Sequence, residues 1–407
     1  MRARAGQPDS PVRRHVVALF TDAARDFLRA PEAISRGLRN ARELSSVERR
    51  VVADAVHDLV RLRRRLAFLA GGEDPVALFD EWLAGAIDPE AGDDRIAAIT
   101  NPVERLGVSL SYPDWIVERL IAAYGEKDAE AIARSMNRRA PLTVRTNRLK
   151  GTRAELRQRL AALGIPSSLT KLAPDGLILH TRQNVYSLEP FRDGWMELQD
   201  EGSQLVAELV APPPRGSVID ACAGAGGKTL ALGAAMENRG RLVALDVSKP
   251  KLEELRRRVA RAGLTNVRAV QVGDELPEGI APASRVLVDA PCSGLGVVRR
   301  NPESKWRLQP NDLVELPVKQ AKILARYAAL VEPGGRLTYA TCSLLPEEND
   351  RVVDGFLAAH PDFSRVPAKE ILGRERALTV GDGEVVRLLP HQHDTDGFFG
   401  AVMRRRR

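Results

Sequence analysis

The sequence predicts an α/β protein in which a doubly wound parallel sheet forms the second half of the chain. Three observations favour this fold. Strand-like segments alternate with helical segments from residue 217 onward, a glycine-rich loop follows the first of these strands, and several strands end at an aspartate. Strands that alternate with helices pair in parallel and are covered by helices on both faces. A small α/β module and an all-helical N-terminal domain are predicted to precede this sheet.

The composition is typical of a globular protein with two or three domains. The chain has 407 residues, of which 44% are hydrophobic and 28% are charged. It contains no run of about 18 apolar residues, so we expect no membrane span, and its basic start lacks the apolar core of a secretory signal. The three cysteines, Cys222, Cys292 and Cys342, indicate neither a disulfide framework nor a zinc-binding pair. We therefore expect a cytoplasmic protein.

The positive charge is concentrated at the start of the chain. The net charge is +7, and the first 65 residues hold 15 Arg and Lys against 8 Asp and Glu, so the rest of the chain is balanced. A basic module joined to a neutral one is typical of proteins with a polyanionic partner, most often nucleic acid. A basic helical domain without such a partner is the alternative. The final run Arg404–Arg407 is expected to be a solvated tail.

Residues 1–130 are predicted to form an all-helical domain. Apolar residues recur at helical spacing in the segment 45–66, and Ser45 and Glu48 form a capping box before it. Stretches rich in Gly and Asp near 71–74 and 85–94 indicate loops between helices. A further helix is expected after Pro113.

Residues 135–200 are predicted to form the small α/β module. Strands are expected over 142–147 and 176–180, with an amphipathic helix over 152–165 between them.

Residues 201–407 are predicted to form the doubly wound domain. A helix over 199–210 ends before three consecutive prolines. The predicted strands cover 217–220, 241–246, 267–272, 285–289 and 336–341, and the predicted helices begin near Lys228, cover 249–263 and lie within 311–331.

The loop DACAGAGGKT (220–229) resembles two nucleotide-binding patterns and departs from both by one residue. The P-loop pattern requires a glycine where Cys222 stands, and the dinucleotide pattern requires a glycine where Thr229 stands. Ligands of a doubly wound sheet bind at the carboxyl ends of its strands, where Asp246 and Asp274 follow the loop. An acidic edge repels a triphosphate but suits ribose hydroxyls, an amine and a cationic centre. S-adenosylmethionine has all three, so we expect it to be the cofactor.

The segment VLVDAPCSG (286–294) places Asp289 and Cys292 at the end of a strand, and the neighbouring strand ends at Cys342. Two cysteines beside an acid favour methylation of C5 of cytosine. A thiolate that adds to C6 makes C5 electron-rich enough to accept a methyl group, and a carboxyl group such as Asp289 stabilises the adduct at N3. Cys222 is expected to be a loop residue near the cofactor without a chemical role.

These segments resemble the RNA cytosine-C5 methyltransferases, and most closely the branch of bacterial ribosomal small subunit methyltransferase B. The matching motifs are DACAGAGGKT, DAPCSG and TCSLLPEEN, together with YSLEPFRDGWMELQDEGSQL, GVVRRNPESKW and PHQHDTDGFF. The resemblance covers roughly residues 110–403. The N-terminal helices resemble, more weakly, the NusB-like RNA-binding domain of that branch.

The resemblance implies a role for each candidate residue. Cys342 is the implied nucleophile, Cys292 assists release of the methylated product, and Asp289 contacts the base near the methionine end of the cofactor. Asp246 and Asp274 are implied to bind ribose and adenine. The implied contacts to the methionine end are Cys222, Ala223, Gly224, Ala225, Gly226, Gly227 and Lys228. The family often has proline at the position of Ala225.

The predicted function is thus methyl transfer from S-adenosylmethionine to C5 of a cytidine in RNA, with 16S ribosomal RNA as the expected substrate. A transfer RNA enzyme of the same chemistry and a non-catalytic RNA-binding assembly factor on the same fold are the alternatives. His391 and His393 lack an evident third ligand, so we expect no metal ion. We expect a monomer.

Overall fold

The computed structural model describes residues 7, 9–86, 88, 92–181, 183–273, 275–276 and 279–407. The described chain separates into two compact units. The first contains the residues up to Arg139 together with Val297–Asp312, and the second contains Ala140–Gly296 and Leu313–Arg407.

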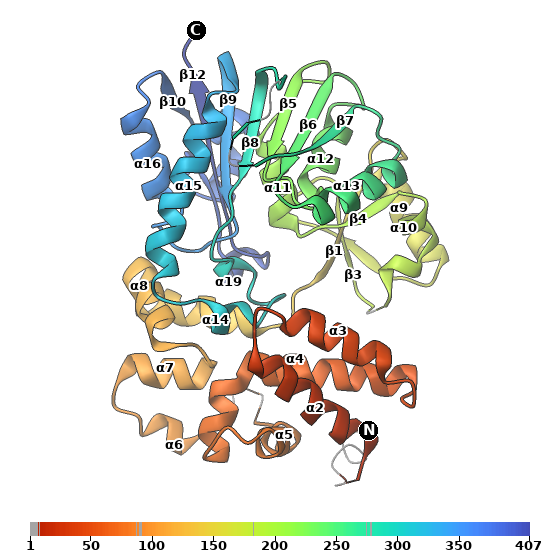
Figure 1. Ribbon diagram of the computed structural model, residues 1–407, viewed down its shortest axis with the longest axis vertical. Coiled ribbons are helices and arrows are strands. Elements are labelled where there is room, and N and C mark those ends of the chain that lie inside the picture. The colour runs from red at the N-terminus through yellow and green to blue at the C-terminus, as the bar shows by residue number, and fades with distance from the viewer. Residues whose placement is uncertain are drawn as a thin grey trace. The chain divides into compact units, whose positions relative to one another are not determined.

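Helices build the first unit, as the sequence predicts (Figure 1). They are α2 (Pro11–Arg25), α3 (Ala30–Asn40), α4 (Ser46–Ala70), α5 (Pro75–Ala84), α6 (Asp94–Ala97), α7 (Pro102–Leu110), α8 (Asp114–Asn137) and α14 (Ser304–Arg307). The predicted capping box is confirmed, because the Ser45 side chain accepts from the Glu48 amide and Glu48 accepts from the Ser45 amide. Helix α4 ends at Gly71, which has a φ of 72°.

The segment Val297–Asp312 packs against these helices although the stretch Ala140–Gly296 separates it from them in the sequence. The Trp306 indole donates a 2.6 Å hydrogen bond to the Val60 carbonyl and packs against the apolar core of α2, α4 and α5. Lys305 is fully buried, with its ammonium 4.0 Å from the centre of the Tyr112 ring and 3.2 Å from the Asn137 side chain. The first unit is therefore assembled from two separate stretches of sequence.

The second unit begins with a four-stranded antiparallel sheet of order β2-β3-β1-β4. Its elements are β1 (Leu142–Thr146), α9 (Arg153–Ala162), β2 (Ser167–Leu169), β3 (Gly176–Leu179), η1 (Val185–Ser187), α10 (Glu189–Arg192) and β4 (Met196–Leu198). Leu156 and Leu160 of α9 pack against Val144 and Leu177 of the sheet. The predicted strands and helix of this module are confirmed, whereas β2 and β4 are too short to give a sequence signal.

The larger sheet has the order β10-β12-β9-β8-β5-β6-β7, with β11 paired to β12. Its strands are β5 (Ser217–Ala221), β6 (Arg241–Asp246), β7 (Val267–Gln271), β8 (Ala283–Asp289), β9 (Val331–Thr341), β10 (Phe363–Val366), β11 (Val386–Leu388) and β12 (Phe398–Arg405). The strands β5 to β9 run parallel, and β12 is antiparallel to both of its neighbours β9 and β10.

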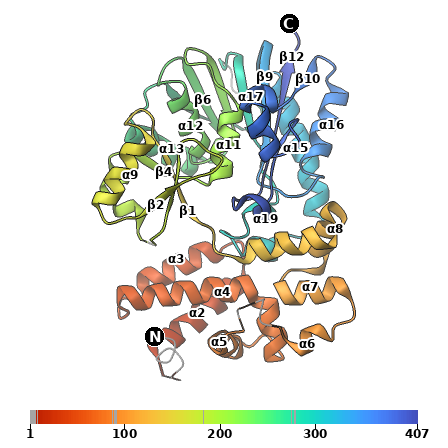
Figure 2. The same cartoon turned by 180° about the vertical axis from the view of Figure 1, so that it is seen from behind.

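Helices cover both faces of this sheet, so the predicted doubly wound fold is confirmed. They are α11 (Glu201–Leu209), α12 (Gly227–Ala235), α13 (Lys249–Ala262), α15 (Asp312–Ala328), α16 (Asp350–Ala359), α17 (Lys369–Leu372), α18 (Arg374–Thr379) and α19 (Pro390–His393), with the short η2 (Leu295–Val297). Leu324 of α15 packs with Val286 of β8, whereas the next residue along β8, Leu287, packs with α11 and α12. Views from opposite sides show α15 and α17 on opposite faces (Figures 1 and 2).

Two further expectations can be compared with the structure. The prediction of a solvated tail over Arg404–Arg407 is wrong for its first half, because Arg404 and Arg405 belong to β12 and pair with β10. Their backbone completes an inner strand of the sheet. Among the described residues, no helix is long and apolar enough to cross a membrane.

Candidate active site

The glycine-rich loop joins β5 to α12 through a run of left-handed backbone. Cys222, Gly224 and Gly226 have φ values of 65°, 56° and 89°, a region that glycine adopts without steric cost. A Cβ added at Gly226 would lie 2.7 Å from Leu255 of α13, whereas one added at Gly224 would meet nothing within 4 Å. The loop is therefore closely packed at Gly226 and open at Gly224. Its Ala225 carbonyl accepts a 2.7 Å hydrogen bond from Arg258, which holds the loop without a proline.

Asp246 stands at the end of β6 and is tied to this loop. One carboxylate oxygen accepts a 2.8 Å hydrogen bond from the Gly224 amide, and the other accepts a 2.8 Å bond from the Ser248 amide. Each oxygen keeps a second lone pair for a further donor. Asp274, the other acid predicted at this edge, lies outside the described residues.

Asp220, in β5 directly before the loop, is an acidic residue that the sequence analysis did not single out. Its side chain is fully buried, and Thr229 donates a 2.6 Å hydrogen bond to one of its oxygens. The other oxygen has no hydrogen-bond partner among the described residues. Burial raises the pKa of Asp220 to about 7, only partly opposed by the Thr229 bond and increased by the charge of Asp289. Its position near the end of an apolar strand and before the glycines was the available signal.

Lys228 and Asp289 form an ion pair at the carboxyl ends of β5 and β8. The Lys228 ammonium lies 2.7 Å from the Asp289 carboxylate and 5.2 Å from the centre of the Phe398 ring. Burial by itself lowers the pKa of Lys228, but the charge and hydrogen bond of Asp289 raise it above its usual value, with a further contribution from Cys342. The pair therefore places a permanent positive charge beside the carboxylate.

Cys292 and Cys342 lie together, as the sequence predicts. Their sulfur atoms are 3.3 Å apart, and both residues are partly buried. The loops that carry them are joined by a 2.8 Å hydrogen bond from the Gly296 amide to the Cys342 carbonyl. The hydrogen bond to Cys342, together with burial, raises the pKa of the Cys292 thiol well above its usual value. Cys292 is therefore held as a thiol in the free protein.

Cys222, the third cysteine, belongs to the loop and packs against the core beneath the sheet. Burial raises the pKa of its thiol to about 12, and the acids Asp289 and Asp220 act in the same direction. This thiol therefore stays protonated at neutral pH.

Glu348 connects the two cysteine loops, and sequence reasoning missed this role. Its side chain is fully buried. One oxygen accepts from the Ser293 amide at 2.8 Å and from Gln320 at 2.9 Å, and the other accepts from the Ser293 hydroxyl at 2.5 Å and from the Ser343 hydroxyl. Ser293 follows Cys292 and Ser343 follows Cys342, so one carboxylate fixes the backbone beside both thiols.

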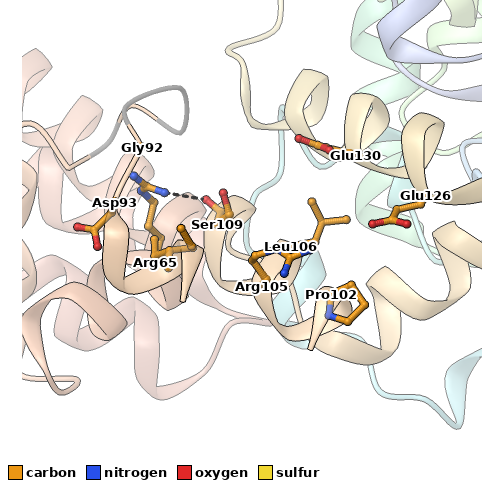
Figure 3. A pocket seen from close by; sticks show the side chains of 11 residues that line it. Arg65, Gly92, Asp93, Pro102, Arg105, Leu106, Ser109, Glu126 and Glu130 are labelled. Carbon is orange, nitrogen blue, oxygen red and sulfur yellow. Dashed lines mark hydrogen bonds between the residues drawn. The ribbon is translucent and has the colours of Figure 1, made fainter. Parts of the chain in front are cut away.

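A separate hollow of about 240 Å³ lies in the first unit (Figure 3). Arg65, which lines it, is 3% exposed and donates to the carbonyls of Ala86 and Ser109 at 3.0 and 3.3 Å. Acidic side chains line the hollow as well, among them Glu126 and Glu130. Mixed charge of this kind does not match an RNA backbone.

The histidines near the end of the chain lie in α19. His393 forms hydrogen bonds of 2.9 and 3.0 Å with the Leu389 amide and the Thr379 carbonyl, so its ring serves the packing of this segment. Over the described ranges, no group of three or more His, Cys, Asp or Glu side chains is placed to hold a metal ion.

Two protein families match the sequence along this architecture. The family described as 16S rRNA methyltransferase RsmB/F matches residues 207–404, and the RsmF/B-like ferredoxin-like domain matches residues 112–186. The probable ribosomal RNA small subunit methyltransferase B of Bacillus subtilis (strain 168) is 36% identical over 357 residues, which cover 86% of this chain and 78% of the relative. The chain belongs to the family of ribosomal RNA small subunit methyltransferase B.

Solved structures share this fold. The crystal structure of the protein PH0851 superposes with a TM-score of 0.79 and 26% identity, covering 98% of this chain and 99% of that one. A methyltransferase homolog protein from Pyrococcus horikoshii superposes with a TM-score of 0.65 and 28% identity, covering 75% of this chain and 100% of that one.

A member of the methyltransferase B family uses S-adenosylmethionine, and the residues at the sheet edge fit this cofactor. The loop is open at Gly224, Asp246 keeps acceptor capacity beside it, and Asp220 presents a buried oxygen without a partner. Acceptors suit the hydroxyl and ammonium groups of the cofactor. The sequence prediction of both the family and the cofactor is confirmed.

Proposed function

We propose that the protein methylates C5 of a cytidine in 16S ribosomal RNA through a covalent bond between Cys342 and C6 of the base. The observation that carries this proposal is the pair of thiols 3.3 Å apart beside the ion pair of Lys228 and Asp289. A binding protein has no need for two thiols in this position.

The proposed reaction begins at Cys342. Its thiolate adds to C6, and the electron pair of the C5–C6 double bond then attacks the methyl group, which bound S-adenosylmethionine supplies as an electrophile. The Lys228 ammonium and the negative charge of a Cys342 thiolate attract each other, an interaction that contributes to the raised pKa of Lys228. The Asp289 carboxylate stabilises the protonated N3 of the adduct by a charge-assisted hydrogen bond.

Cys292 is proposed to act in product release. The proton on C5 must be removed before the bond between Cys342 and C6 can break, and the electron pair of that C–H bond restores the double bond. The high pKa of Cys292 makes its thiolate a strong base. Its thiol proton passes to water first and the thiolate then takes up the C5 proton, so one proton reaches the solvent in each turnover.

The cofactor residues are proposed from the resemblance to the family, and those that the structure describes also lie at or next to strand ends. We assign the methionine end to the loop from Cys222 to Lys228, the ribose to Asp246 and the adenine to Asp274. Asp220 is added to this set, because its unpartnered oxygen lies next to the loop in sequence.

The substrate is inferred from the relatives. Those of Bacillus subtilis and Pseudomonas putida are named ribosomal RNA small subunit methyltransferase B, and the basic first 65 residues suit an RNA partner. We propose three functional parts: a NusB-like RNA-binding domain over 1–130, an α/β module over 135–200 and a catalytic domain over 201–407. We also propose a monomer that acts in the cytoplasm. Transfer RNA is the second candidate substrate.

The test is a covalent trap. The Cys292→Ala variant is mixed with 16S ribosomal RNA and S-adenosylmethionine, and a denaturing gel is inspected for an RNA–protein band. We expect a band, its loss in Cys292→Ala/Cys342→Ala, and its retention in Cys292→Ala/Cys222→Ala, which removes the third cysteine as a matched control. A band that survives loss of Cys342 assigns the nucleophile elsewhere.

Two parallel measurements make the trap decisive. Calorimetry establishes that each variant still binds S-adenosylmethionine, and the same gel is run with transfer RNA. The covalent mechanism is refuted if the Cys292→Ala variant gives no band with either RNA although it binds the cofactor and the wild type methylates RNA. A band with transfer RNA alone replaces the ribosomal substrate.

A further inference from the structure

Three arginines form a row across adjacent strands at the edge of the large sheet opposite to the cysteines. Arg285 of β8 stands next to Arg336 of β9, and Arg336 stands next to Arg404 of β12. Residues that are directly paired across strands share one face of the sheet, and neighbouring strands lie about 4.8 Å apart. The row therefore spreads three guanidinium groups over about 10 Å on one face.

The row lines an open hollow of about 550 Å³ that has a strongly positive wall. Arg405, Arg406 and Arg407 also line it, with Gly334 and Ser364, and no acidic residue is among its lining residues. Asp362 pairs with Arg405 at 3.2 Å, and Glu370 reaches Arg404 only at 3.9 Å. Within the described ranges, the guanidinium groups of Arg336, Arg406 and Arg407 have no hydrogen bond or ion pair.

This arrangement is electrostatically unfavourable in the absence of an anion. Like charges that are directly paired across strands repel each other. Burial lowers the pKa of Arg285, and the charges of Arg336 and Arg404 lower it further. The pKa of Arg336 is lowered by burial and by Arg404 in the same way. An anion in the hollow would remove this repulsion.

The row is remote from the cysteines. Five residue steps along β9 separate Arg336 from Thr341, the residue before Cys342. At about 3.3 Å per residue, this distance is on the order of 16 Å. The arginines therefore do not belong to the catalytic site.

We propose that this arginine site binds the phosphodiester backbone of RNA at a distance from the methylated cytidine. The proposal rests on the proposed function in one respect, namely that the substrate is RNA. A chain of phosphates fits better than a single phosphate, because the row extends over about 10 Å and continues into Arg406 and Arg407. Contacts of arginine to phosphate fix position without reading sequence. The site increases affinity for RNA and leaves the choice of cytidine to other residues.

The test compares the salt dependence of RNA binding. In Arg336→Gln/Arg404→Gln, we expect the slope of log K against log salt to decrease in magnitude by about 1 to 2, since each lost phosphate contact removes about 0.7 to 0.9. At low salt we expect affinity to fall about tenfold or more. The KM for RNA rises, and kcat at saturating RNA is unchanged.

Two further variants support this comparison. Arg406→Gln/Arg407→Gln leaves β9 and the paired part of β12 intact and is expected to reduce the slope as well, which guards against misfolding of the first variant. Arg351→Gln/Arg374→Gln removes the same charge from exposed positions of the second unit and is expected to bind RNA as the wild type does. An unchanged slope in both arginine-site variants overturns the proposal, and so does an equal decrease in the matched control.

Two arms separate the remaining possibilities. Inorganic phosphate is titrated both by itself and as a competitor of RNA. If phosphate binding is saturable and both variants abolish it while their RNA binding stays unchanged, the site binds free phosphate and the RNA assignment is refuted. The covalent trap is run in parallel. If the wild type forms the adduct and the variants bind RNA normally, the arginine-site proposal is refuted and the proposed mechanism stands. If the variants lose RNA binding and the wild type forms no adduct, the proposed mechanism is refuted and the arginine-site proposal stands.

Discussion

The buried carboxyl group of Asp220 makes the stability of the second unit depend on pH. Burial raises its pKa from a usual value of 3.8 to about 7. Each pH unit of difference between the folded and unfolded states corresponds to about 1.4 kcal/mol, so ionisation of Asp220 in the folded state costs about 4 kcal/mol. Replacement by asparagine keeps the shape and removes the titration.

The direction of the effect follows from the sign of the shift. Below about pH 4 the group is protonated in both states and carries no penalty. As the pH rises to about 7, the unfolded chain ionises while the folded chain keeps its proton, so the free energy of unfolding decreases. Above about pH 7 both states are ionised and the full penalty remains. The wild type therefore loses about 4 kcal/mol relative to Asp220→Asn between these limits.

The assay is urea denaturation of wild type and Asp220→Asn, followed by circular dichroism at intervals from about pH 4 to about pH 8.5, a range that brackets both pKa values. The difference between the free energies of unfolding of the two proteins at each pH removes the contributions of most other titrating groups, because these are shared. Thr229→Val removes the hydrogen bond from Thr229 to the Asp220 carboxyl group and is expected to move the transition to higher pH. A difference that stays constant within about 1 kcal/mol over this range refutes the raised pKa.

Three further changes test the geometry of the site. Glu348→Ala leaves several buried donors without an acceptor, at about 1–3 kcal/mol each, so we expect kcat to fall at least tenfold and the melting temperature to drop. Glu348→Gln should restore most of the activity and most of the thermal stability. Equal losses in the two variants would contradict a positioning role for Glu348. Gly296→Ala would place a Cβ 2.2 Å from the Gly397 carbonyl and 2.7 Å from that of Cys342. We expect it to separate the cysteine loops and abolish the trapped adduct, and normal trapping would show that the contact is not needed. Asp246→Ala removes the acceptor of the Gly224 amide. Calorimetry should show about tenfold weaker binding of S-adenosylmethionine, consistent with about 1.4 kcal/mol of lost interaction. Unaltered affinity would exclude Asp246 as a cofactor contact.

The local sequence predicts β6 and β8 because each contains a short apolar run that ends at an aspartate. β6 has the predicted bounds, and β5 and β8 differ from theirs by one or two residues. The proximity of Cys292 and Cys342 also follows from local sequence, since parallel neighbours bring their carboxyl ends to the same edge.

Features that depend on distant residues could not be predicted in this way. Glu348 bonds to Ser293 across 55 positions, and nothing in either segment alone indicates the contact. The arginine row requires the register of three strands, one of them antiparallel, whereas the sequence shows only the terminal run. The unpartnered oxygen of Asp220 is likewise visible only after the strand has been buried.

The two-part assembly of the first unit sets an order for its folding during synthesis. Trp306 and Lys305 complete this unit, yet they are translated only after the first half of the second unit. At about 5–20 residues per second, the ribosome needs roughly ten to thirty-five seconds to travel from Arg139 to Asp312. During that interval the Val60 carbonyl and the adjoining apolar surface of the helices are not covered by Trp306. An N-terminal domain usually completes its folding before the next domain is synthesised, and this order is partly reversed here. A fragment that ends at Arg139 therefore lacks the residues that complete its own core.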